Sequence, residues 1–349
     1  MIINMKKEYI IPIFVPNLGC PMECTFCSQQ KITGKQTNVT AKDVKETIEY
    51  YLNNFKDESK YVEVAFFGGS FTGIDTEIQK ELLETANEYI NEGKVNSIRI
   101  STRPDYITKD ILKMLKKYHV KTIELGVQSS NDYILAKSKR GHNFEDVKRA
   151  SKLIRRYRFR LGHQMMVGMP ESTEIDEINT AKDLIKLKPK MVRVYPVLVI
   201  KGTELANEYK DGEYTPLTIE QATQRCKEII YMFRKKRIDI IRVGLQNTDE
   251  ITDPSKSTSE VLAGPYHPAF RQLVDDSMWY DSIAEKIKKI NMKVKKVEIR
   301  VNPEYTNNII GHKKENLKRL KQMYDVEVIA KPDENMKPGK FEINVVETY

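Results

Sequence analysis

Three cysteines near the amino end of the chain have the type and spacing of ligands for a metal cluster. Cys20, Cys24 and Cys27 stand as Cys-x3-Cys-x2-Cys, directly after the apolar run 9–15. Cysteine thiolates hold iron–sulfur clusters, and a [4Fe–4S] cluster normally takes four of them. Three thiolates on one short loop therefore leave one iron open to a further ligand.

Zinc and a disulfide are the other uses of closely spaced cysteines. A structural zinc site needs a closed tetrahedral set of ligands, and the first histidine of the chain is His119, far from the loop. A disulfide would leave one of the three cysteines over, and nothing in the sequence indicates secretion. The spacing favours the open cluster, with zinc as the competing interpretation.

Length and composition predict one large domain with a small appendage. The chain has 349 residues, a net charge of +9 and one cysteine, Cys226, outside the loop. Cys226 falls in the amphipathic stretch 221–235, which favours a core position over a catalytic one. We find no signal peptide and no segment of membrane-spanning length. A soluble cytoplasmic protein with no membrane partner is therefore expected.

Short apolar runs alternate with amphipathic stretches of helical length. Strands are predicted at 61–67, 98–101, 121–127, 160–167, 191–199 and 238–243. Helices are predicted at 41–55, 77–91, 109–118, 144–157, 174–187 and 219–235. This alternation predicts an α/β fold with a parallel sheet closed into a partial (β/α)6 barrel, similar to a TIM barrel. In such barrels the chemistry gathers at the carboxyl ends of the strands.

The pattern changes at residue 292, so we expect a first domain at 1–291 and a second, small α+β domain at 292–349. Strand 294–301 precedes a short helix, a basic turn at 309–314 and a second helix that ends at Tyr324. Strands 326–330 and 341–346 follow. This β-α-α-β-β order resembles a reduced KH domain, a module that clamps single-stranded nucleic acid against the turn between its helices.

The KH-like resemblance implies an RNA contact at the basic turn. The residues concerned are Gly311, His312, Lys313, Lys314 and Lys318. The usual turn is G-x-x-G, and Lys314 stands in place of its second glycine. The alternative is a small α/β cap that only braces the barrel.

Positive charge is concentrated in two parts of the chain. Between Asp281 and Leu320 there are eleven Lys and Arg against five Asp and Glu, and the second basic run is 152–160. Such clusters attract polyanions, of which nucleic acid is the usual one. A solvated helix face explains them equally well.

Together with the segments that follow it, the cysteine loop resembles the radical S-adenosylmethionine (SAM) superfamily. The similarity is greatest to the branch that contains the Elp3 subunit of Elongator and the oxygen-independent coproporphyrinogen dehydrogenases. The matching stretches run in order from about residue 10 to 245. They are Phe67-Gly-Gly-Ser-Phe-Thr72, Thr102-Arg-Pro-Asp-Tyr106, Glu124-Leu-Gly-Val-Gln-Ser129, Lys139-Arg-Gly-His142, Met165-Met-Val-Gly-Met-Pro170, Val194-Tyr-Pro196 and Ile200-Lys-Gly-Thr203.

The resemblance implies two cofactors, a [4Fe–4S] cluster and SAM. In the family, SAM chelates the open iron through its amino and carboxylate groups, and an electron from the reduced cluster cleaves it to a 5′-deoxyadenosyl radical. A low-potential electron donor such as ferredoxin or flavodoxin is implied as a partner. The cofactor carries the difficult step, while the protein supplies position and shelter.

The resemblance also implies roles for individual residues. Gly68, Gly69 and Ser70 match the motif that receives the SAM amino group, because glycines let the backbone approach a ligand. Phe14 and Phe26 match aromatic positions beside the cluster, and Gln128 and Gln164 match ribose-facing positions. Arg140 fits the arginine that pairs with the SAM carboxylate, and Ser101 takes the place of an acidic SAM contact. As alternatives, the glycines serve any turn, Gln128 caps a strand end, and Arg140 is a surface cation.

The function expected from this resemblance is modification of an RNA nucleotide, most readily in transfer RNA. The sequence lacks the acetyltransferase domain of Elp3, so the acetyl chemistry of Elp3 is not carried over. Two alternatives stay open: a radical SAM enzyme acting on a small molecule, and a non-catalytic iron–sulfur protein that binds RNA. Tyr266 and His267 lie in a turn near the expected barrel mouth, where either substrate contact or packing explains them.

Overall fold

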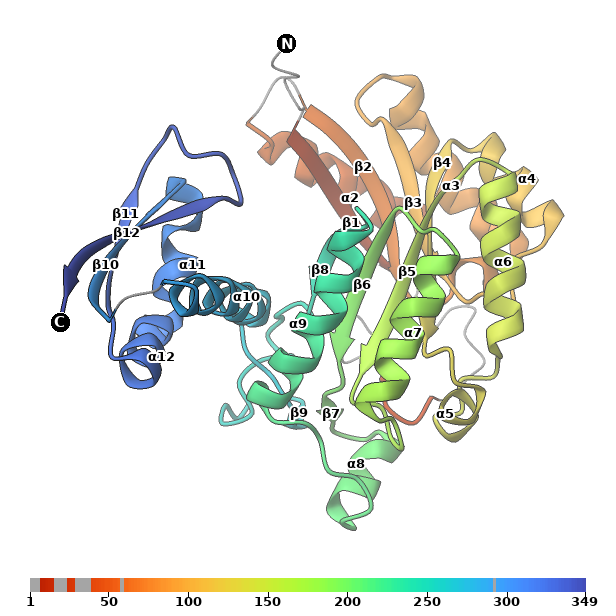
Figure 1. Ribbon diagram of the computed structural model, residues 1–349. Helices are drawn as coiled ribbons and strands as arrows, with labels where there is room; N and C mark the ends of the chain where they lie inside the picture. Colours follow the sequence, from red (N-terminus) through yellow and green to blue (C-terminus); the bar gives the residue numbers. More distant parts are fainter. Residues whose placement is uncertain (1–6, 16–23, 29–38, 57–59, 291–292) are drawn as a thin grey trace. The chain divides into compact units, whose positions relative to one another are not determined.

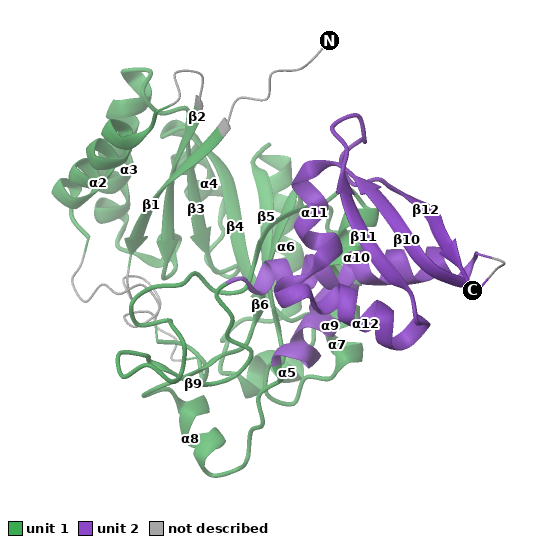
Figure 2. Ribbon diagram, turned by 90° about the vertical axis from the view of Figure 1, so that its left-hand side faces the viewer, with its two compact units in different colours: residues 1–218, 229–268 green, residues 219–228, 269–349 purple. Residues whose placement is uncertain are grey.

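The computed structural model describes residues 7–15, 24–28, 39–56, 60–290 and 293–349. The chain divides into two compact units (Figure 2), one formed by residues 1–218 and 229–268 and the other by 219–228 and 269–349. Cys20, the first of the three cluster cysteines, lies outside the described residues.

The first unit is built on a parallel sheet in the order β1-β2-β3-β4-β5-β6-β8. Figure 1 shows this sheet curled into a partial barrel with helices along its outer side. The apolar run before the cysteines forms β1, which joins the six strands predicted after the loop, so the sheet has seven strands among the residues that the structure describes. The strands are β1 (Lys7–Val15), β2 (Lys60–Gly68), β3 (Ser97–Thr102), β4 (Val120–Gln128), β5 (Arg160–Val167), β6 (Met191–Pro196) and β8 (Asp239–Val243).

Helices supply the long crossovers that parallel strands require. They begin at polar caps, as at Thr40, whose hydroxyl accepts from the Asp43 amide while the Asp43 carboxylate accepts from the Thr40 amide. The helices are α2 (Ala41–Asn54), α3 (Thr76–Asn91), α4 (Lys109–Lys117), α5 (Asp132–Lys137), α6 (Phe144–Arg156), α7 (Glu174–Lys186), α8 (Glu204–Lys210) and α9 (Ile219–Lys235).

Strand β3 shows how the sequence places polar groups inside the barrel. All six of its residues are buried. Successive side chains of a strand point to opposite faces, so Ile98 and Ile100 share one face while Ser97, Arg99 and Ser101 share the other. Arg99 and Ser101 line the interior cavity described below. The polar face of the strand is therefore the inner face of the barrel.

The prediction of a single strand at 191–199 was wrong, because this segment forms two separate strands. Strand β6 ends at Pro196, and a separate strand, β7 (Val199–Ile200), pairs antiparallel with β9 (Val261–Ala263). Proline has no N–H to extend a ladder, which explains the break.

The second unit has a three-stranded mixed sheet in the order β11-β10-β12. Strand β10 pairs parallel with β11 and antiparallel with β12, and the unit keeps the β-α-α-β-β order predicted from the sequence. Its core joins Ile283 of α10 to Val297 and Ile299 of β10 and to Leu320 of α12. The elements are α10 (Phe270–Lys288), β10 (Val294–Val301), α11 (Thr306–Ile310), α12 (Glu315–Tyr324), β11 (Glu327–Pro332) and β12 (Phe341–Thr348).

Helix α10 belongs to the compact second unit, and residues 219–228 of α9 do as well. The change of pattern in the sequence placed the boundary after this helix, at 291–292, and the division into functional domains stays a prediction. Cys226 of α9 has no exposed surface, as expected of a core residue.

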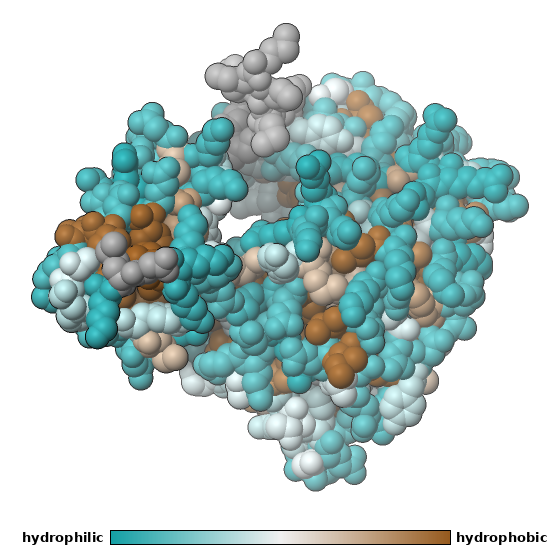
Figure 3. All heavy atoms as spheres, in the orientation of Figure 1, coloured by the Kyte–Doolittle hydropathy of each residue, from teal (hydrophilic) through white to brown (hydrophobic). Residues whose placement is uncertain are grey.

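Figure 3 shows a largely hydrophilic surface with an apolar patch over the C-terminal strands. Val345 and Val346 of β12 contribute to the exposed apolar surface of this unit. None of the helices in the described part of the chain is both long enough and apolar enough to span a lipid bilayer.

Candidate functional site

The turn that carries Cys24 and Cys27 is fixed by backbone hydrogen bonds. The Cys27 amide donates to the Cys24 carbonyl over 2.9 Å. Thr25 between them donates its amide to the carbonyl of Ser138 (3.3 Å), and its own carbonyl accepts from the amide of Leu205 (2.8 Å). Segments more than a hundred residues away in the sequence thus hold the two sulfur-bearing residues in place.

Apolar packing supports the same turn. Cys24 and Phe26 are buried in a cluster with Ile134, Met169 and Leu205, and Cys27 packs at its edge. A thiol placed in such a rigid setting keeps its position when it binds a metal, because the surrounding groups do not have to reorganise.

Gly68 ends β2 in a conformation that favours glycine. Its φ is +104°, and a Cβ atom there would lie 2.9 Å from the carbonyl oxygen of Val15. The amide of Gly69 donates to the same oxygen over 2.9 Å. The two glycines therefore let the end of β2 lie directly against the end of β1, from which the cysteine loop departs.

Ser70 is buried and makes its contacts within the protein. Its hydroxyl lies 2.9 Å from the Thr102 hydroxyl and accepts from the amide of Arg103 over 3.1 Å. These bonds join the loop after β2 to the end of β3. The expected role of Ser70 toward SAM stays a prediction.

A cavity of about 650 Å³ occupies the inside of the barrel. It brings together residues predicted from widely separated parts of the sequence, at or near the carboxyl ends of the strands. Those that line it are Phe14, Phe26, Cys27, Gly68, Ser101, Gln128 and Gln164.

Arg140 and Gln128 meet beside Gly126, at the end of β4. The Arg140 Nη2 donates to the Gly126 carbonyl over 2.9 Å, and its Nη1 lies 3.5 Å from Cys24 Sγ. A Cβ on Gly126 would lie 2.7 Å from Arg140 Nη2. Arg140 is only 9 % exposed, which excludes the alternative of a surface cation.

Two buried polar atoms in this corner have no hydrogen-bond partner among the described residues. They are Arg140 Nε and Gln128 Oε1. Gln128 also has a left-handed backbone, with φ +70°. Buried donors and acceptors without partners are costly and rare in folded proteins. Their presence beside Cys24 indicates a place prepared for a polar ligand.

A buried charge network, which was not predicted from the sequence, reaches the cavity through Arg99 and Arg193. Arg99 contacts Glu63 and Glu124, each over 2.6 Å. Arg193 holds the second of these carboxylates from the other side, through Nε–Oε2 (2.5 Å) and Nη2–Oε1 (3.0 Å) contacts. The signal in the sequence was a charged residue in the middle of an apolar strand, as in Arg99 and Glu124.

The network fixes the ionisation of Glu124. Burial raises the pKa of Glu124. Arg193 and then Arg99 lower it by more than burial raises it, so the pKa lies below its ordinary value. Burial likewise lowers the pKa of Arg193, and the Glu124 carboxylate outweighs this effect and raises it. Glu124, Arg193 and Arg99, whose pKa is also raised, therefore stay charged at neutral pH.

Gln164 and Ser101 are tied to this network. The side-chain amide of Gln164 donates to Glu124 Oε2 over 3.1 Å and to Ser101 Oγ over 3.3 Å. Glu124 thus orients the Gln164 side chain, which in turn contacts Ser101.

The basic turn of the second unit adopts left-handed backbone angles. Gly311 has φ +76°, Lys313 +51° and Lys314 +63°. Lys314 thus takes the conformation that glycine favours at this position, at a cost in strain. Lys313, Lys314 and Lys318 are exposed, and His312 is partly buried.

Asp276 of α10 anchors this turn and was also not predicted from the sequence. Its carboxylate accepts from the His312 amide and from the Asn308 side chain, each over 2.8 Å. Asn316 donates its side-chain amide to the Asp276 carbonyl over 2.9 Å. Burial raises the pKa of Asp276. Since Asp276 lies thirty-six residues before His312, no local pattern could have indicated the contact.

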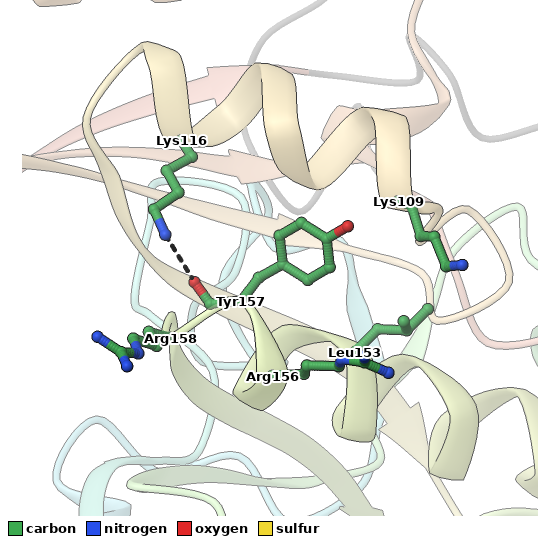
Figure 4. Close-up of a pocket in the computed structure, with 6 residues that line it drawn as sticks. All are labelled: Lys109, Lys116, Leu153, Arg156, Tyr157 and Arg158. Carbon is green, nitrogen blue, oxygen red and sulfur yellow. Dashed lines mark hydrogen bonds between the residues drawn. The ribbon is translucent and has the colours of Figure 1, made fainter.

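The basic run 152–160 contributes to a pocket of about 380 Å³ between α4 and α6. Lys109, Lys116, Arg156 and Arg158 line it, and no carboxylate of the described residues does. Figure 4 shows the Tyr157 ring between the two helices, with Lys116 donating to the Tyr157 carbonyl over 3.3 Å. The basic lining would attract an anion. A solvated helix face explains the same run of charges equally well, so both interpretations remain.

Tyr266 and His267 are not among the described residues that line the barrel cavity. Tyr266 packs against the small cluster of Leu198, Ile200, Ile251 and Val261. This contact favours the packing explanation of the turn over substrate contact.

Comparison with known proteins agrees with the geometry of the cavity. Residues 14–184 match the radical SAM superfamily, and residues 189–280 match a radical SAM C-terminal domain. The chain belongs to the radical SAM superfamily. A [4Fe–4S] cluster and SAM are therefore its cofactors.

Three relatives define this likeness. The chain is 33% identical over 186 residues to a tRNA uridine(34) acetyltransferase of Methanocaldococcus infernus, covering 47% of this chain and 34% of the relative. It is 30% identical over 226 residues to an uncharacterised protein of Methanocaldococcus jannaschii, covering 62% and 69%. The solved structure of an archaeal Elp3 from Methanocaldococcus infernus matches with a TM-score of 0.63 and 23% identity, covering 86% and 67%.

These relatives differ in what they support. The solved Elp3 structure supports the fold of this radical SAM protein. The chain spans about a third of the length of the tRNA uridine(34) acetyltransferase. The activity of that longer protein is therefore not a property shown for this one.

The described residues fit the two cofactors of the family. Cys24 and Cys27 offer two thiols on a rigid turn. Arg140 Nε and Gln128 Oε1 supply the unpaired donor and acceptor that a carboxylate and a ribose hydroxyl need. The glycine at 68 keeps the end of β2 free of a side chain.

Proposed function

We propose that this radical SAM enzyme modifies a nucleotide of RNA, with transfer RNA as the substrate. The observation that carries the proposal is the cavity that joins Cys27 to the polar groups of Gln128 and Gln164. The relative named tRNA uridine(34) acetyltransferase supports an RNA substrate. The group installed by this protein and the base that receives it are left open.

The corner beside Cys24 binds and orients SAM. The cluster and SAM held at this corner would supply the one-electron chemistry that activates a C–H bond or a base of the substrate. Arg140 would offer its unpaired Nε to the SAM carboxylate in a charge-assisted hydrogen bond. Gln128 offers its amide oxygen to a ribose hydroxyl.

The buried charges keep this binding corner rigid. Glu124 stays ionised between Arg99 and Arg193 and holds the Gln164 amide in one orientation. A fixed amide is pre-organised for a ligand, so less entropy is lost on binding. We assign Glu124 a positioning role toward Gln164.

The basic turn of the second unit binds the RNA backbone. Lys313, Lys314 and Lys318 are exposed, while Asp276 already occupies the His312 amide. The lysine side chains therefore make the phosphate contacts. This supports the KH-like interpretation in which the turn holds a single strand.

The direct test compares RNA nucleosides from cells with and without the gene by mass spectrometry. Loss of one modified nucleoside from the transfer RNA fraction, restored by the wild-type gene, is the expected result. An unchanged nucleoside profile, together with accumulation of a small metabolite in the deletion strain, would favour the alternative of a small-molecule substrate.

A charge reversal tests the role of the turn. In the double variant Lys313→Glu with Lys314→Glu, we expect weaker binding of transfer RNA. The salt dependence of binding should fall by about one unit of slope for each phosphate that the variant no longer neutralises. Lys235→Glu with Lys236→Glu on α9 and its following turn makes the same change in net charge and is the matched control. Equal RNA affinity of the two double variants would remove the turn from the proposal.

A further inference from the structure

Arg242 is a cation of the barrel cavity that the assigned cofactors do not account for. It lies on β8, one residue before the strand ends, and lines the cavity. Its register partner across the sheet is Arg193 of β6. Two guanidinium groups thus stand side by side on neighbouring strands, an arrangement that like charges disfavour.

The two arginines differ in how their charge is balanced. Arg193 is bound by Glu124 through two contacts, and its guanidinium lies 4.9 Å from the centre of the Phe67 ring. The four buried charges, Glu63, Arg99, Glu124 and Arg193, balance each other. Arg242 adds a further positive charge to this set.

Arg242 has no carboxylate partner among the described residues. Its Nε donates to the Gly244 carbonyl over 3.2 Å. The charged and titratable groups that act on it are Tyr195 and Arg193. Burial and then Arg193 lower its pKa, and Tyr195 opposes them. Of the described residues that line the cavity, the one acidic side chain is Glu8, which is exposed near the amino end of β1.

Two donor nitrogens of Arg242 are left for a ligand in the cavity. Its two η nitrogens make no hydrogen bond to the described residues, while Nε is occupied. Two parallel N–H donors on one planar group match the two oxygens of a carboxylate or a phosphate. A half-buried cation without a counter-ion is costly, so an anion that arrives with the substrate would remove that cost.

The position of Arg242 separates it from the corner assigned to SAM. Strand β8 is the edge of the sheet, three strands away from β4, which carries Gln128. At about 4.8 Å for each strand, this is roughly 14 Å along the sheet. As the edge strand, β8 also borders the open side of the partial barrel (Figure 1).

We propose that Arg242 binds an oxyanion of the substrate, a phosphate or a carboxylate, at the edge of the barrel opposite β1. This inference rests on the proposed function, since it gives the substrate of that same cavity a charged group. Two sources share this chemistry: a phosphodiester beside the target nucleotide, and a small organic acid that serves as a second substrate.

The first experiment labels arginines of the anaerobically reconstituted holoenzyme with phenylglyoxal and locates the adducts by peptide mass spectrometry. Arg242 is expected to react, while Arg99 and Arg193 are protected by their carboxylates. Protection of Arg242 by a transfer RNA fraction but not by acetate assigns the phosphodiester. Protection by acetate alone assigns the small acid. Protection by SAM alone, or by none of the three, overturns the proposal.

The second experiment measures affinity in variants that keep the fold. Arg242→Gln is expected to weaken binding of the protecting probe about tenfold or more, because glutamine cannot make a charge-assisted hydrogen bond to the oxyanion. The loss of SAM affinity should be smaller. Arg242→Lys keeps the charge but not the fork and should recover part of the affinity, while Lys236→Gln is the matched surface control. Equal probe affinity in Arg242→Gln and Lys236→Gln contradicts the proposal.

The two experiments separate this inference from the proposed function. If wild-type cells and the deletion strain have the same RNA nucleosides, the RNA function fails, yet protection by acetate would still support an oxyanion at Arg242. If the nucleosides differ but Arg242 is not protected, only the present inference fails.

Discussion

The barrel interior and the basic turn of the second unit both carry cations, but they hold them in opposite ways. Inside the barrel, the side chains of Arg99 and Arg193 are 3 % and 10 % exposed and share the carboxylate of Glu124. At the turn, Lys313 and Lys314 are exposed, and neither forms an ion pair with a described carboxylate.

The difference separates two uses of charge. Buried and paired charges are screened little by salt and fix geometry, so they position ligands over short distances. Exposed charges hold no fixed geometry, act through a screened field and suit a polyanion of variable sequence. Radical chemistry needs the first kind of charge, and the RNA binding proposed for the turn needs the second.

Removing the shared carboxylate should have the largest effect on stability. In Glu124→Gln, Arg99 and Arg193 lose a buried counter-charge, and we expect the free energy of unfolding to fall by about 3–5 kcal/mol. Urea denaturation measures it. The matched control is Glu285→Gln, which removes an exposed pair with Lys289 and should cause no measurable change. A loss in Glu124→Gln no larger than in this control would show that the interior charges are not coupled.

Acid should weaken the barrel through two buried histidines. Burial lowers the pKa of His163 to about 3, and burial together with Arg140 and Arg103 lowers that of His142 to about 4. The unfolded chain therefore takes up protons first as pH falls. The free energy of unfolding is therefore highest above about pH 6.5 and falls as the pH is lowered toward pH 4. At pH 5 the expected loss is about 2 kcal/mol for each histidine.

Urea denaturation at pH 7 and pH 5 checks this prediction. His163→Gln should show a smaller loss between the two pH values than the wild type, because one of the two buried imidazoles is gone. An identical loss in both proteins would mean that His163 does not contribute.

Breaking the anchor of the basic turn should have a smaller effect. Asp276→Ala removes the acceptor of the His312 amide and the Asn308 side chain. We expect a loss of about 1–2 kcal/mol in the free energy of unfolding and weaker binding of transfer RNA, because the backbone of the turn that carries the lysines loses its anchor. Asp281→Ala, on the same helix but paired with Lys227, is the control. RNA affinity equal to that of the control would contradict the anchoring role.

Relieving the strained lysine should give the smallest effect, with the opposite sign. Lys314 has φ +63°, so Lys314→Gly is expected to stabilise the protein by about 0.5–1 kcal/mol. Lys318→Gly, inside α12, should destabilise it instead. Thermal unfolding of both variants provides the comparison, and a less stable Lys314→Gly would show that the turn is not strained.

Gly311→Asp is a poor probe of RNA binding, since a Cβ there would lie 2.9 Å from Asn316.

Much of the fold was predictable because each strand and helix of a parallel α/β sheet is indicated by the hydrophobic pattern and caps of its own segment. Apolar runs and caps predicted the long strands and helices to within a few residues, and the Gly-Gly pair marked the end of β2. The short elements α5, α8 and β9 were not predicted. The break after Pro196 was missed because Val197 to Ile200 continue the apolar run. Only the pairing of β7 with β9 shows that this run leaves the sheet.

The site divides in the same way. Cys24, Cys27 and Arg140 were predicted as site residues because their neighbours form recognisable stretches, and the structure brings Arg140 to within 3.5 Å of Cys24. Glu124 and Asp276 were missed as partners because their contacts depend on register and on chain segments far apart in sequence. A charged residue within an apolar strand was the available sign for Glu124, and none existed for Asp276.

The central claim is that the cysteine turn and the Arg140 corner together hold SAM at an open iron. Electron paramagnetic resonance of the anaerobically reconstituted, reduced protein tests it directly, with release of 5′-deoxyadenosine as a second readout. We predict that added SAM changes the cluster spectrum and that 5′-deoxyadenosine is released. A spectrum that ignores SAM, without any 5′-deoxyadenosine, would contradict the account.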